Sequence, residues 1–204
     1  MDLVSGYWQI DLPPEEQEKC AIITSTGLYQ PTCMPQGLCN TPATFQWAMD
    51  NILSDLKLSC VLVYLDNINV FSRTFAEHLN DLEDVFKRLI NNNLKLKPKK
   101  CSFFKSELEY LGFVITKEGL HPQPAKIKAI KLMKPPSCVR DIQVFLGMTG
   151  YYCCFVQDFL LKAAPLFHLL KRDSVFSWSE EAQKSFDILR TCLMTAPILN
   201  YPNF

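Results

Sequence analysis

Short runs of β-branched and aromatic residues dominate the first third of the chain, and such runs favour strands. The most regular run is 60–71, where an apolar stretch leads into Asp66 and Asn67 and a second apolar stretch follows. Aspartate and asparagine favour tight turns, so this segment predicts a β-hairpin. Further short strands are predicted in this region at 7–12, 19–25 and 28–34.

Helical periodicity begins after the first three predicted strands. Thr41 is typical of an N-cap and Pro42 of a first helical position, so a helix is expected from there to about Leu56. The apolar residues of 75–91 recur at spacings of three and four. This spacing predicts an amphipathic helix that ends at the three asparagines 91–93.

The second half of the chain changes from strands to helices. Strands are expected at 101–104 and 109–115, with Gly119 in the turn after them. The predicted helices beyond this turn are 124–133, 138–156, 159–171 and 179–195. Strands and helices mixed in this order indicate an α+β fold, in which helices back an antiparallel sheet and a helical region follows. We expect a domain boundary near 118–123.

Composition excludes several classes of protein. The 204 residues are 48% hydrophobic and 21% charged, as in globular proteins. No apolar run approaches the roughly 18 residues of a membrane span, and Met1 precedes Asp2 directly, so we expect no membrane span and no signal peptide. The nine cysteines are scattered without a CxxC spacing or a grouping with the three histidines. Such a set is typical of reduced thiols in an intracellular protein, which is not secreted.

The net charge of zero conceals two opposed blocks. Residues 1–84 carry 3 basic and 12 acidic side chains, a net charge of −9, whereas residues 85–140 carry 13 and 3, a net charge of +10. A basic block beside an acidic one is a candidate polyanion-binding surface next to a cation-binding one. The alternative is a solvated helix face with a lysine-rich loop. The close spacing of five lysines favours nucleic acid: Lys95, Lys97, Lys99, Lys100 and Lys105.

The predicted hairpin places the Asp66 carboxylate close to apolar surface, which costs free energy unless something compensates it. A hydrogen-bonded turn or a metal ion would do so, and the hairpin alone leaves both open. Asp2 is a second carboxylate at one end of a short apolar segment, and it favours the metal. Two carboxylates from separate strands can hold a pair of Mg²⁺ ions roughly 3.5–4 Å apart. Such ions commonly share their coordination with substrate phosphates.

Seven segments in fixed order strengthen this interpretation. They are DLVSGYWQI at 2–10, MPQGL at 34–38, TPATFQ at 41–46, VYLDN at 63–67, CSFF at 101–104, EYLGFV at 109–114 and FLGMTGYY at 145–152. Together they resemble the ordered motifs of reverse transcriptases, in particular those of the Ty3/gypsy class of LTR retrotransposons. The resemblance covers nearly all 204 residues, and the ordered set is more specific than any single motif.

The resemblance implies an organisation and an activity. Residues 1–118 correspond to the palm with a residual part of the fingers, 119–173 to the thumb, and 174–204 to the lead-in to a connection or RNase H-like domain that this chain does not contain. The implied activity is RNA-directed DNA polymerisation, a nucleotidyl transfer to a primer 3′-hydroxyl that uses two Mg²⁺ ions. The implied partners are an RNA or DNA primer–template duplex and a deoxynucleoside triphosphate.

The resemblance also assigns the residues around the transferred nucleotide. Asp2 and Asp66 match the two aspartates that bind the metal ions, and the backbone carbonyl of Leu3 completes one coordination sphere. Tyr7 matches an aromatic residue beneath the sugar that blocks a ribose 2′-hydroxyl, although an aromatic residue in a strand usually packs in a core. The remaining nucleotide-binding positions are Gln36, Gly37 and Leu65, of which the first two could equally form a turn without function.

Further residues are assigned to the primer and template. Tyr110, Leu111 and Gly112 match the strand that grips the primer end. Gln143, Gly147 and Tyr151 recur every four residues, so they share one helix face, and they match the thumb positions along the duplex minor groove. Without the resemblance, such a face more often packs. The basic block would contact phosphates through Lys97, Lys99 and Lys100.

Three departures from the family bear on activity. Asn67 replaces the second aspartate of the palm hairpin, Cys153 and Cys154 stand where two arginines are common, and the basic residues of the fingers would lie upstream of Met1. We therefore expect a reverse transcriptase fragment that is inactive as this chain. Two alternatives remain open. One is an active module completed by fingers from another chain, and the other is a non-enzymatic nucleic-acid-binding or interaction protein derived from a transposon.

Overall fold

The computed structural model describes residues 1–171 and 176–200, and the chain divides into two compact units, Met1–Phe104 and Lys105–Phe204. The expected boundary near 118–123 falls inside a sheet of the second unit, so the compact units divide earlier in the sequence than we expected. The assignment of these parts as palm, thumb and lead-in stays a prediction. The ends of the predicted thumb and lead-in, 172–175 and 201–204, lie outside the described residues.

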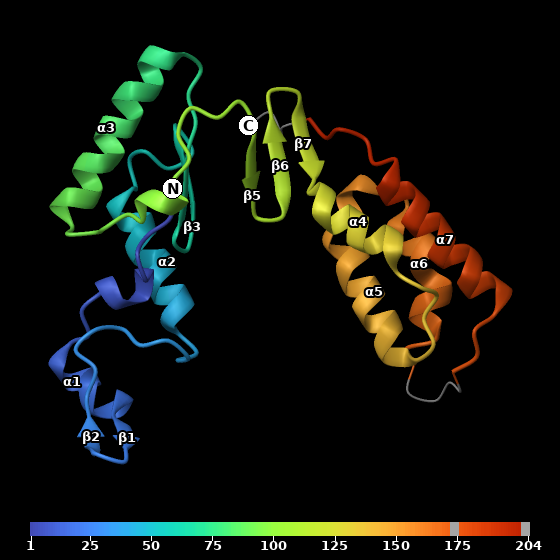
Figure 1. Cartoon of the computed structure of the whole chain (residues 1–204), viewed down its shortest axis with the longest axis horizontal. Coiled ribbons are helices and arrows are strands. Elements are labelled where there is room, and N and C mark those ends of the chain that lie inside the picture. Colours follow the sequence, from blue (N-terminus) through green and yellow to red (C-terminus); the bar gives the residue numbers. More distant parts are fainter. Residues whose placement is uncertain (172–175, 201–204) are drawn as a thin grey trace. The chain divides into compact units, whose positions relative to one another are not determined.

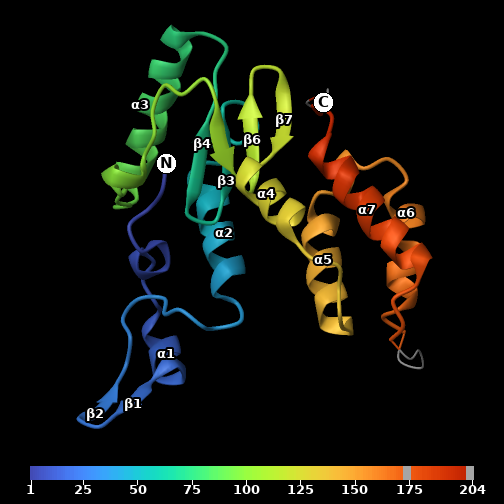
Figure 2. The same ribbon diagram turned by 45° about the vertical axis from the view of Figure 1, so that its right-hand side comes forward.

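The first unit is built around the β3–β4 hairpin and two long helices; α2, α3 and β3 are labelled in Figure 1 and β4 in Figure 2. Its elements are η1 (Gly6–Gln9), α1 (Pro14–Gln17), η2 (Glu18–Cys20), β1 (Ile22–Thr24), β2 (Gly27–Tyr29), α2 (Thr41–Ile52), β3 (Val61–Tyr64), β4 (Asn67–Val70), α3 (Phe75–Asn91) and η3 (Pro98–Lys100).

The two strongest sequence predictions for this unit are confirmed. β3 and β4 pair antiparallel from Val61–Val70 to Tyr64–Asn67, and α3 spans the predicted residues. A capping box begins α3: the Thr74 side chain accepts from the Glu77 backbone N–H, and the Glu77 side chain accepts from the Thr74 N–H. α2 contacts β3 and α3 contacts β4, so both helices pack on the hairpin (Figures 1 and 2).

Other predictions for the first unit are wrong in part. Strand 7–12 is instead the 3-10 turn η1, because Ser5 takes a left-handed φ of 48° and turns the chain. Residues 101–104 form no strand, and the Phe104 ring packs on α3, 5.1 Å from the Phe75 ring. Thr41 is the first residue of α2 and not its N-cap. Its hydroxyl donates to the Pro35 carbonyl at 3.1 Å. α2 ends at Ile52, four residues early, and the strands at 19–25 and 28–34 are shortened to β1 and β2.

One apolar cluster holds the first unit together. Phe45 and Met49 from α2 meet Val61 and Ile68 from the hairpin, and all four side chains are at most 1% exposed. Leu3 joins the same cluster. The hairpin with Asp66 and the segment with Asp2 therefore share one core.

The second unit contains a three-stranded antiparallel sheet and four helices among its described residues. Its elements are β5 (Leu108–Tyr110), β6 (Phe113–Thr116), β7 (Gly119–Pro122), α4 (Pro124–Leu132), α5 (Val139–Tyr151), η4 (Cys153–Phe155), α6 (Phe159–His168) and α7 (Glu180–Met194).

The sheet of this unit differs from the prediction in two ways. The single strand expected at 109–115 is instead the β5–β6 hairpin, because Leu111 and Gly112 take positive φ and turn the chain, and β7 is an additional strand. Gly119 was expected only in a turn, but it begins a third strand and has a φ of 143°. A Cβ at this position would lie 2.3 Å from the Leu199 carbonyl oxygen, so only glycine allows the backbones to approach. Predicted helix 138–156 also ends early. α5 stops at Tyr151 and the 3-10 turn η4 follows.

The core of the second unit joins its helices to its sheet. Phe145 of α5 packs on Phe186 of α7 with ring centroids 4.5 Å apart. Leu166 of α6 is fully buried in the same cluster, and Phe113 and Leu120 of the sheet pack against it. The sheet therefore belongs to the helical unit.

The fold class is confirmed: the molecule is α+β, with small antiparallel sheets and helices. All nine cysteines are free thiols, as expected. Within the described ranges, no helix combines the length and the apolar character that crossing a membrane requires.

Candidate active site

The β3–β4 hairpin carries Asp66 at its tip. Tyr64 pairs with Asn67, so Leu65 and Asp66 alone form the turn. Leu65 has a φ of 51°, in the left-handed region that residues other than glycine, asparagine and aspartate seldom adopt. Backbone strain of this kind persists where surrounding contacts enforce it.

Gln46 of α2 supplies such contacts. Its Oε1 accepts from the Leu65 N–H at 2.7 Å, and its Nε2 donates to the Val63 carbonyl at 3.3 Å and to Asp50 Oδ1 at 2.9 Å. Both arms of the amide are therefore bonded. A buried donor without a partner costs roughly 1–3 kcal/mol, so Gln46 helps to hold the strained turn in place.

Asp2 lies in a segment beside the hairpin. Asp2 forms an antiparallel bridge with Asn67, and the Leu3 N–H donates to the Asp66 carbonyl at 3.2 Å. On its other side, the Asp2 carbonyl accepts from the Lys97 N–H at 2.8 Å. The backbone pairing thus brings Asp2, Leu3 and Asp66 into adjacent positions. That the two carboxylates share a cation stays a prediction.

Asn67 occupies the third side-chain position of the candidate metal site. Its Nδ2 donates to Asp66 Oδ1 at 3.3 Å, a bond that an ionised aspartate at this position could not make. The available donors are two carboxylates, a backbone carbonyl and one amide oxygen, all hard oxygen ligands that suit Mg²⁺. Within 1–171 and 176–200, no three Asp, Glu, His or Cys side chains gather as a metal site. The residues fit Mg²⁺ provided that water and substrate oxygens complete its shell.

A cation of the chain itself contacts one of the carboxylates. Lys100 Nζ lies 3.2 Å from Asp2 Oδ2, and the Asp2 side chain is 16% exposed whereas that of Lys100 is 56% exposed. An ion pair with one exposed partner contributes little, roughly 0–1 kcal/mol. Lys100 can therefore leave Asp2 when a divalent cation or a phosphate competes for either partner.

Gly6 lets the chain after Asp2 pass close to the hairpin. A Cβ on Gly6 would lie 2.8 Å from Phe45 Cζ and 3.3 Å from Asp66 Cβ. The next residue, Tyr7, packs edge-on against Phe45 with ring centroids 5.2 Å apart. Core packing of Tyr7 is therefore observed. Its place beside the glycine that approaches Asp66 is compatible with a contact to the nucleotide sugar, which stays a prediction.

Gln36 and Gly37 form an exposed turn ahead of α2. Gly37 has a φ of 94°, and no atom lies within 4 Å of where its Cβ would be. The turn is open to solvent, as a loop that contacts an incoming nucleotide must be. Its proposed role stays a prediction.

In the second unit, the residues predicted to grip the primer form another two-residue turn. Tyr110 pairs with Phe113, so Leu111 and Gly112 form the turn, with φ values of 46° and 73°. We call these two residues the grip turn. The Tyr151 hydroxyl of α5 donates to the Leu111 carbonyl at 2.5 Å. The structure thus joins two of the predicted primer–template elements directly.

The predicted duplex face of α5 is exposed. Gln143, Gly147 and Tyr151 all face solvent, and no atom lies within 4 Å of a Cβ built on Gly147. The opposite face carries the buried residues Ile142, Phe145, Leu146 and Thr149. Gln143 and Gly147 therefore do not pack in the core, which leaves this face available to a ligand.

The basic block is divided between the two units. Residues 85–104 carry six basic and no acidic side chains, and residues 105–140 carry seven basic and three acidic ones. Lys97, Lys99 and Lys100 are exposed around η3 of the first unit. Each unit therefore carries its own group of basic residues, and residues 85–140 do not belong to a single compact unit.

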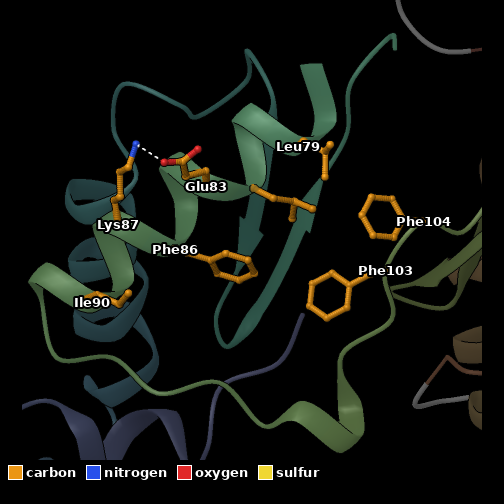
Figure 3. Close-up of a pocket in the computed structure, with 8 residues that line it drawn as sticks. Leu79, Glu83, Phe86, Lys87, Ile90, Phe103 and Phe104 are labelled. Carbon is orange, nitrogen blue, oxygen red and sulfur yellow. Dashed lines mark ion pairs between the residues drawn. The ribbon is translucent and has the colours of Figure 1, made fainter. Parts of the chain in front are cut away.

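An apolar hollow of about 580 Å³ lies elsewhere in the first unit. Figure 3 shows that its walls come from α3 and from the segment before the second unit, with a 2.9 Å ion pair between Glu83 and Lys87 at its edge. Its apolar lining is formed by Leu79, Leu82, Phe86, Ile90, Phe103 and Phe104. None of the predicted site residues lines this hollow.

Three further residues contribute to these sites. Gln46 lies in the TPATFQ motif and accepts from the Leu65 N–H. Tyr152 follows Tyr151, and its hydroxyl donates to the Gly112 carbonyl at 2.7 Å. Gly6 lies inside the first motif. Each is adjacent to an assigned residue or in a matched motif, which was the available signal. Their partners are distant in sequence, so their roles could not be inferred from spacing.

Comparison with known proteins shows the family of this chain. Residues 1–115 match the family described as Reverse transcriptase (RNA-dependent DNA polymerase). The whole chain is 40% identical to a retrovirus-related Pol polyprotein from transposon 297 of Drosophila melanogaster and 34% identical to that from transposon gypsy of the same organism. The alignments cover 19% and 21% of these relatives, so the chain spans about a fifth of their length.

Solved structures show the same likeness. The foamy viral protease–reverse transcriptase in complex with double-stranded DNA superposes with a TM-score of 0.89 and 27% identity, covering 98% of this chain and 35% of that one. The foamy viral protease–reverse transcriptase in complex with an RNA/DNA hybrid gives a TM-score of 0.87 and 27% identity, covering 98% and 27% of the two chains.

Proposed function

Because this chain belongs to the reverse transcriptase family of Ty3/gypsy-type retrotransposon Pol polyproteins, we propose that its first unit carries the metal-binding part of a DNA polymerase site. One observation carries the proposal: Asp2 pairs with Asn67 directly beside the Asp66 turn. Two carboxylates on adjacent strands are suited to phosphoryl transfer assisted by two metal ions.

In this proposal Asp2, Asp66 and the Leu3 carbonyl hold two Mg²⁺ ions. When bound, such ions polarise the primer hydroxyl and neutralise charge on the triphosphate. The residues of the chain supply position. Tyr7 lies beneath the nucleotide sugar, and the Leu65 turn fixes the direction of the Asp66 carboxylate. Gln36 and Gly37 contact the nucleotide from their open turn.

The second unit supplies contacts to the primer–template duplex. The grip turn contacts the primer end, and the exposed Gln143, Gly147 and Tyr151 lie along the minor groove. Lys97, Lys99 and Lys100 of the first unit contact phosphates. The nucleic-acid complexes of the similar foamy viral proteins support this assignment.

We further propose that these 204 residues do not extend a primer by themselves. Asn67 leaves the site with two carboxylates, and each 1.36 kcal/mol of lost transition-state stabilisation costs about tenfold in rate. Within residues 1–84, cations that could hold a triphosphate are also few. Residues 1–84 carry three basic side chains. Two of them are engaged with acids, Lys19 with Glu16 at 2.8 Å and Lys57 with Asp50 at 2.7 Å.

A primer-extension assay with Mg²⁺ tests both parts of the proposal. Three proteins are compared: this chain, its Asn67→Asp variant, and that variant joined to the preceding segment of a gypsy-type relative. We expect no extension from the first two and extension from the third. Extension by the unmodified chain would refute its proposed inactivity. Failure of the third, while it still binds duplex, would refute the polymerase assignment of Asp2 and Asp66.

A second candidate function is duplex binding without synthesis. It is favoured by the exposed α5 face, which lies within the second unit and needs no metal. We expect weak, sequence-independent binding that falls steeply as salt rises, because lysine–phosphate contacts release counterions. Fluorescence anisotropy with a labelled duplex measures this. Replacement of Lys97, Lys99 and Lys100 by Glu should abolish binding, and binding that survives this change would point to another surface.

A further inference from the structure

Two neighbouring tyrosines at the end of α5 both bond to the grip turn. The Tyr151 hydroxyl donates to the Leu111 carbonyl at 2.5 Å, and the Tyr152 hydroxyl donates to the Gly112 carbonyl at 2.7 Å. The Gly112 carbonyl also accepts from the Gln123 N–H at 3.1 Å. Both carbonyls of a two-residue turn are therefore held by groups 11 to 40 residues away in the chain.

Ring packing supports the same contact. Phe113, the residue after the turn, stacks on Tyr151 with centroids 5.3 Å apart and an interplanar angle of 24°. Tyr152 meets the same ring edge-on at 5.6 Å. A Cβ on Gly112 would lie 3.3 Å from Tyr151 Cε1, tighter than ordinary contact. The turn fits closely against the two tyrosines.

The two tyrosines differ in their surroundings. Tyr151 is 53% exposed and belongs to the predicted duplex face, whereas Tyr152 is 3% exposed. Tyr151 can therefore touch a ligand and the turn at once. Tyr152 can act on a ligand only through the turn. Burial raises the pKa of Tyr152 above its ordinary value of 10.0, so its hydroxyl remains a donor to a higher pH than that of an exposed tyrosine.

The backbone conformation of the grip turn is unfavourable unless surrounding contacts stabilise it. Leu111 and Gly112 both have positive φ, and a leucine in this region is strained. Strained conformations persist when their surroundings enforce them, and they cluster where a ligand is positioned. Two hydroxyl bonds and a stacked ring enforce this one.

We propose that Tyr152 is a positioning residue for the primer end, which holds the grip turn at a fixed distance from the α5 duplex face together with Tyr151. The grip turn and the duplex face then contact a primer as one rigid surface within the second unit. This inference rests on the proposed function, since it takes the turn as the primer-end contact.

The hydroxyl can be tested apart from the ring. Tyr152→Phe and Tyr151→Phe keep the aromatic packing and remove only the donor. Tyr29→Phe is the matched control, because Tyr29 lies in the first unit and its hydroxyl lies 3.2 Å from the hydroxyl of the nearby Thr26. Circular dichroism and the urea midpoint of each variant verify that it folds.

The first measurement is amide hydrogen exchange of residues 108–116 in the free chain, which requires no ligand. One hydrogen bond contributes roughly a factor of 2–10 to a local opening equilibrium. We expect about fivefold faster exchange in Tyr152→Phe, a larger increase in the double variant, and no change in Tyr29→Phe. Unchanged exchange in the double variant would overturn the proposed restraint.

The second measurement compares the binding of two duplexes of equal length, one with a recessed primer end and one blunt. We expect the wild-type chain to prefer the recessed end, and Tyr152→Phe to lose most of that preference while its affinity for blunt duplex is kept. A purely structural role would weaken both affinities equally, and that result would overturn the positioning role. If the wild-type chain binds neither duplex, the proposed function fails, while the exchange measurement still decides whether the tyrosines restrain the turn.

Discussion

Two hairpins of this molecule, β3–β4 and β5–β6, have similar turns, but a helix holds one turn through a backbone N–H and the other through backbone carbonyls. Each has a two-residue turn that begins with a leucine of positive φ, Leu65 in β3–β4 and Leu111 in β5–β6. In the first, an amide oxygen of α2 accepts from the turn N–H. In the second, hydroxyls of α5 and the residue after it donate to the turn carbonyls.

The difference follows from what each turn presents. The first turn carries a carboxylate, and its bond to α2 uses the Leu65 N–H, so the contact with α2 does not involve the Asp66 carboxylate, whose Oδ1 accepts from Asn67 Nδ2. The second turn, Leu111 and Gly112, carries no polar or ionisable side chain. The tyrosine hydroxyls hold it through both of its backbone carbonyls. Residues distant in sequence therefore hold both leucines, Leu65 and Leu111, in their strained positive-φ conformation.

The largest expected effect comes from removing the support of the first turn. In Gln46→Ala the Leu65 N–H loses its acceptor and the Val63 carbonyl loses a donor. We expect the free energy of unfolding of the first unit to fall by about 2 kcal/mol. Urea unfolding followed by segment-resolved hydrogen exchange measures this, because the two units can unfold separately.

Asn51→Ala is the matched control for this experiment. Asn51 lies on the same helix and is exposed, so its change should shift stability by less than about 0.5 kcal/mol. Equal effects of the two substitutions would show that Gln46 contributes only helix propensity. The hydrogen bonds of Gln46 would then not stabilise the Leu65 turn as the tyrosine hydroxyls are proposed to stabilise the Leu111 turn.

The second prediction addresses the second turn. Gly112→Ala places a side chain at a φ of 73°, with its Cβ 3.3 Å from Tyr151 Cε1. We expect a loss of roughly 1–2 kcal/mol in the unfolding free energy of the second unit. Gly147→Ala is the control: it is helical with open space around it and should stabilise by about 0.5–1 kcal/mol. A neutral Gly112→Ala would mean that the turn relaxes freely.

These turns also show how far the sequence alone could lead. The hairpin at 60–71 and helix α3 were predictable because their signals are local: apolar runs with a turn between them, and apolar residues at spacings of three and four. The strand predicted at 101–104 was wrong because Phe103 and Phe104 pack on a helix earlier in the chain. Nothing in their own neighbourhood reveals that contact.

The same limit applies to the site. The placement of Asp2 beside Asp66 followed from their positions at strand ends, and the backbone pairing agrees with it. The roles of Gln46 and Tyr152 could not follow, because each depends on a backbone group 19 or 40 residues away. A sequence motif can indicate that such residues are important, but their hydrogen-bond partners are identified only in the folded structure.

The third prediction concerns pH. Burial raises the pKa of Tyr152 above its ordinary value of 10.0, so the folded second unit favours the neutral phenol. The stability that this provides is fully present below about pH 10 and is lost as pH rises through the raised pKa. We expect the melting temperature of the second unit to fall more steeply above pH 10 in the wild-type chain than in Tyr152→Phe. Thermal unfolding between pH 8 and 11 measures this, and parallel profiles would contradict it.

The smallest expected effect tests whether backbone strain or side-chain packing dominates at each of the two leucines, Leu65 and Leu111. Asparagine tolerates positive φ better than leucine. Leu111 is 38% exposed, so Leu111→Asn loses little burial and should gain about 0.5 kcal/mol from relieved strain. Leu65 packs against the core of the first unit, and there the lost apolar contact should exceed the relief, so that Leu65→Asn destabilises by about 0.5 kcal/mol. Unfolding free energies of the two variants give the signs. If both variants stabilise, the apolar contacts of Leu65 do not offset its backbone strain, and the β3–β4 turn would be the less well supported of the two.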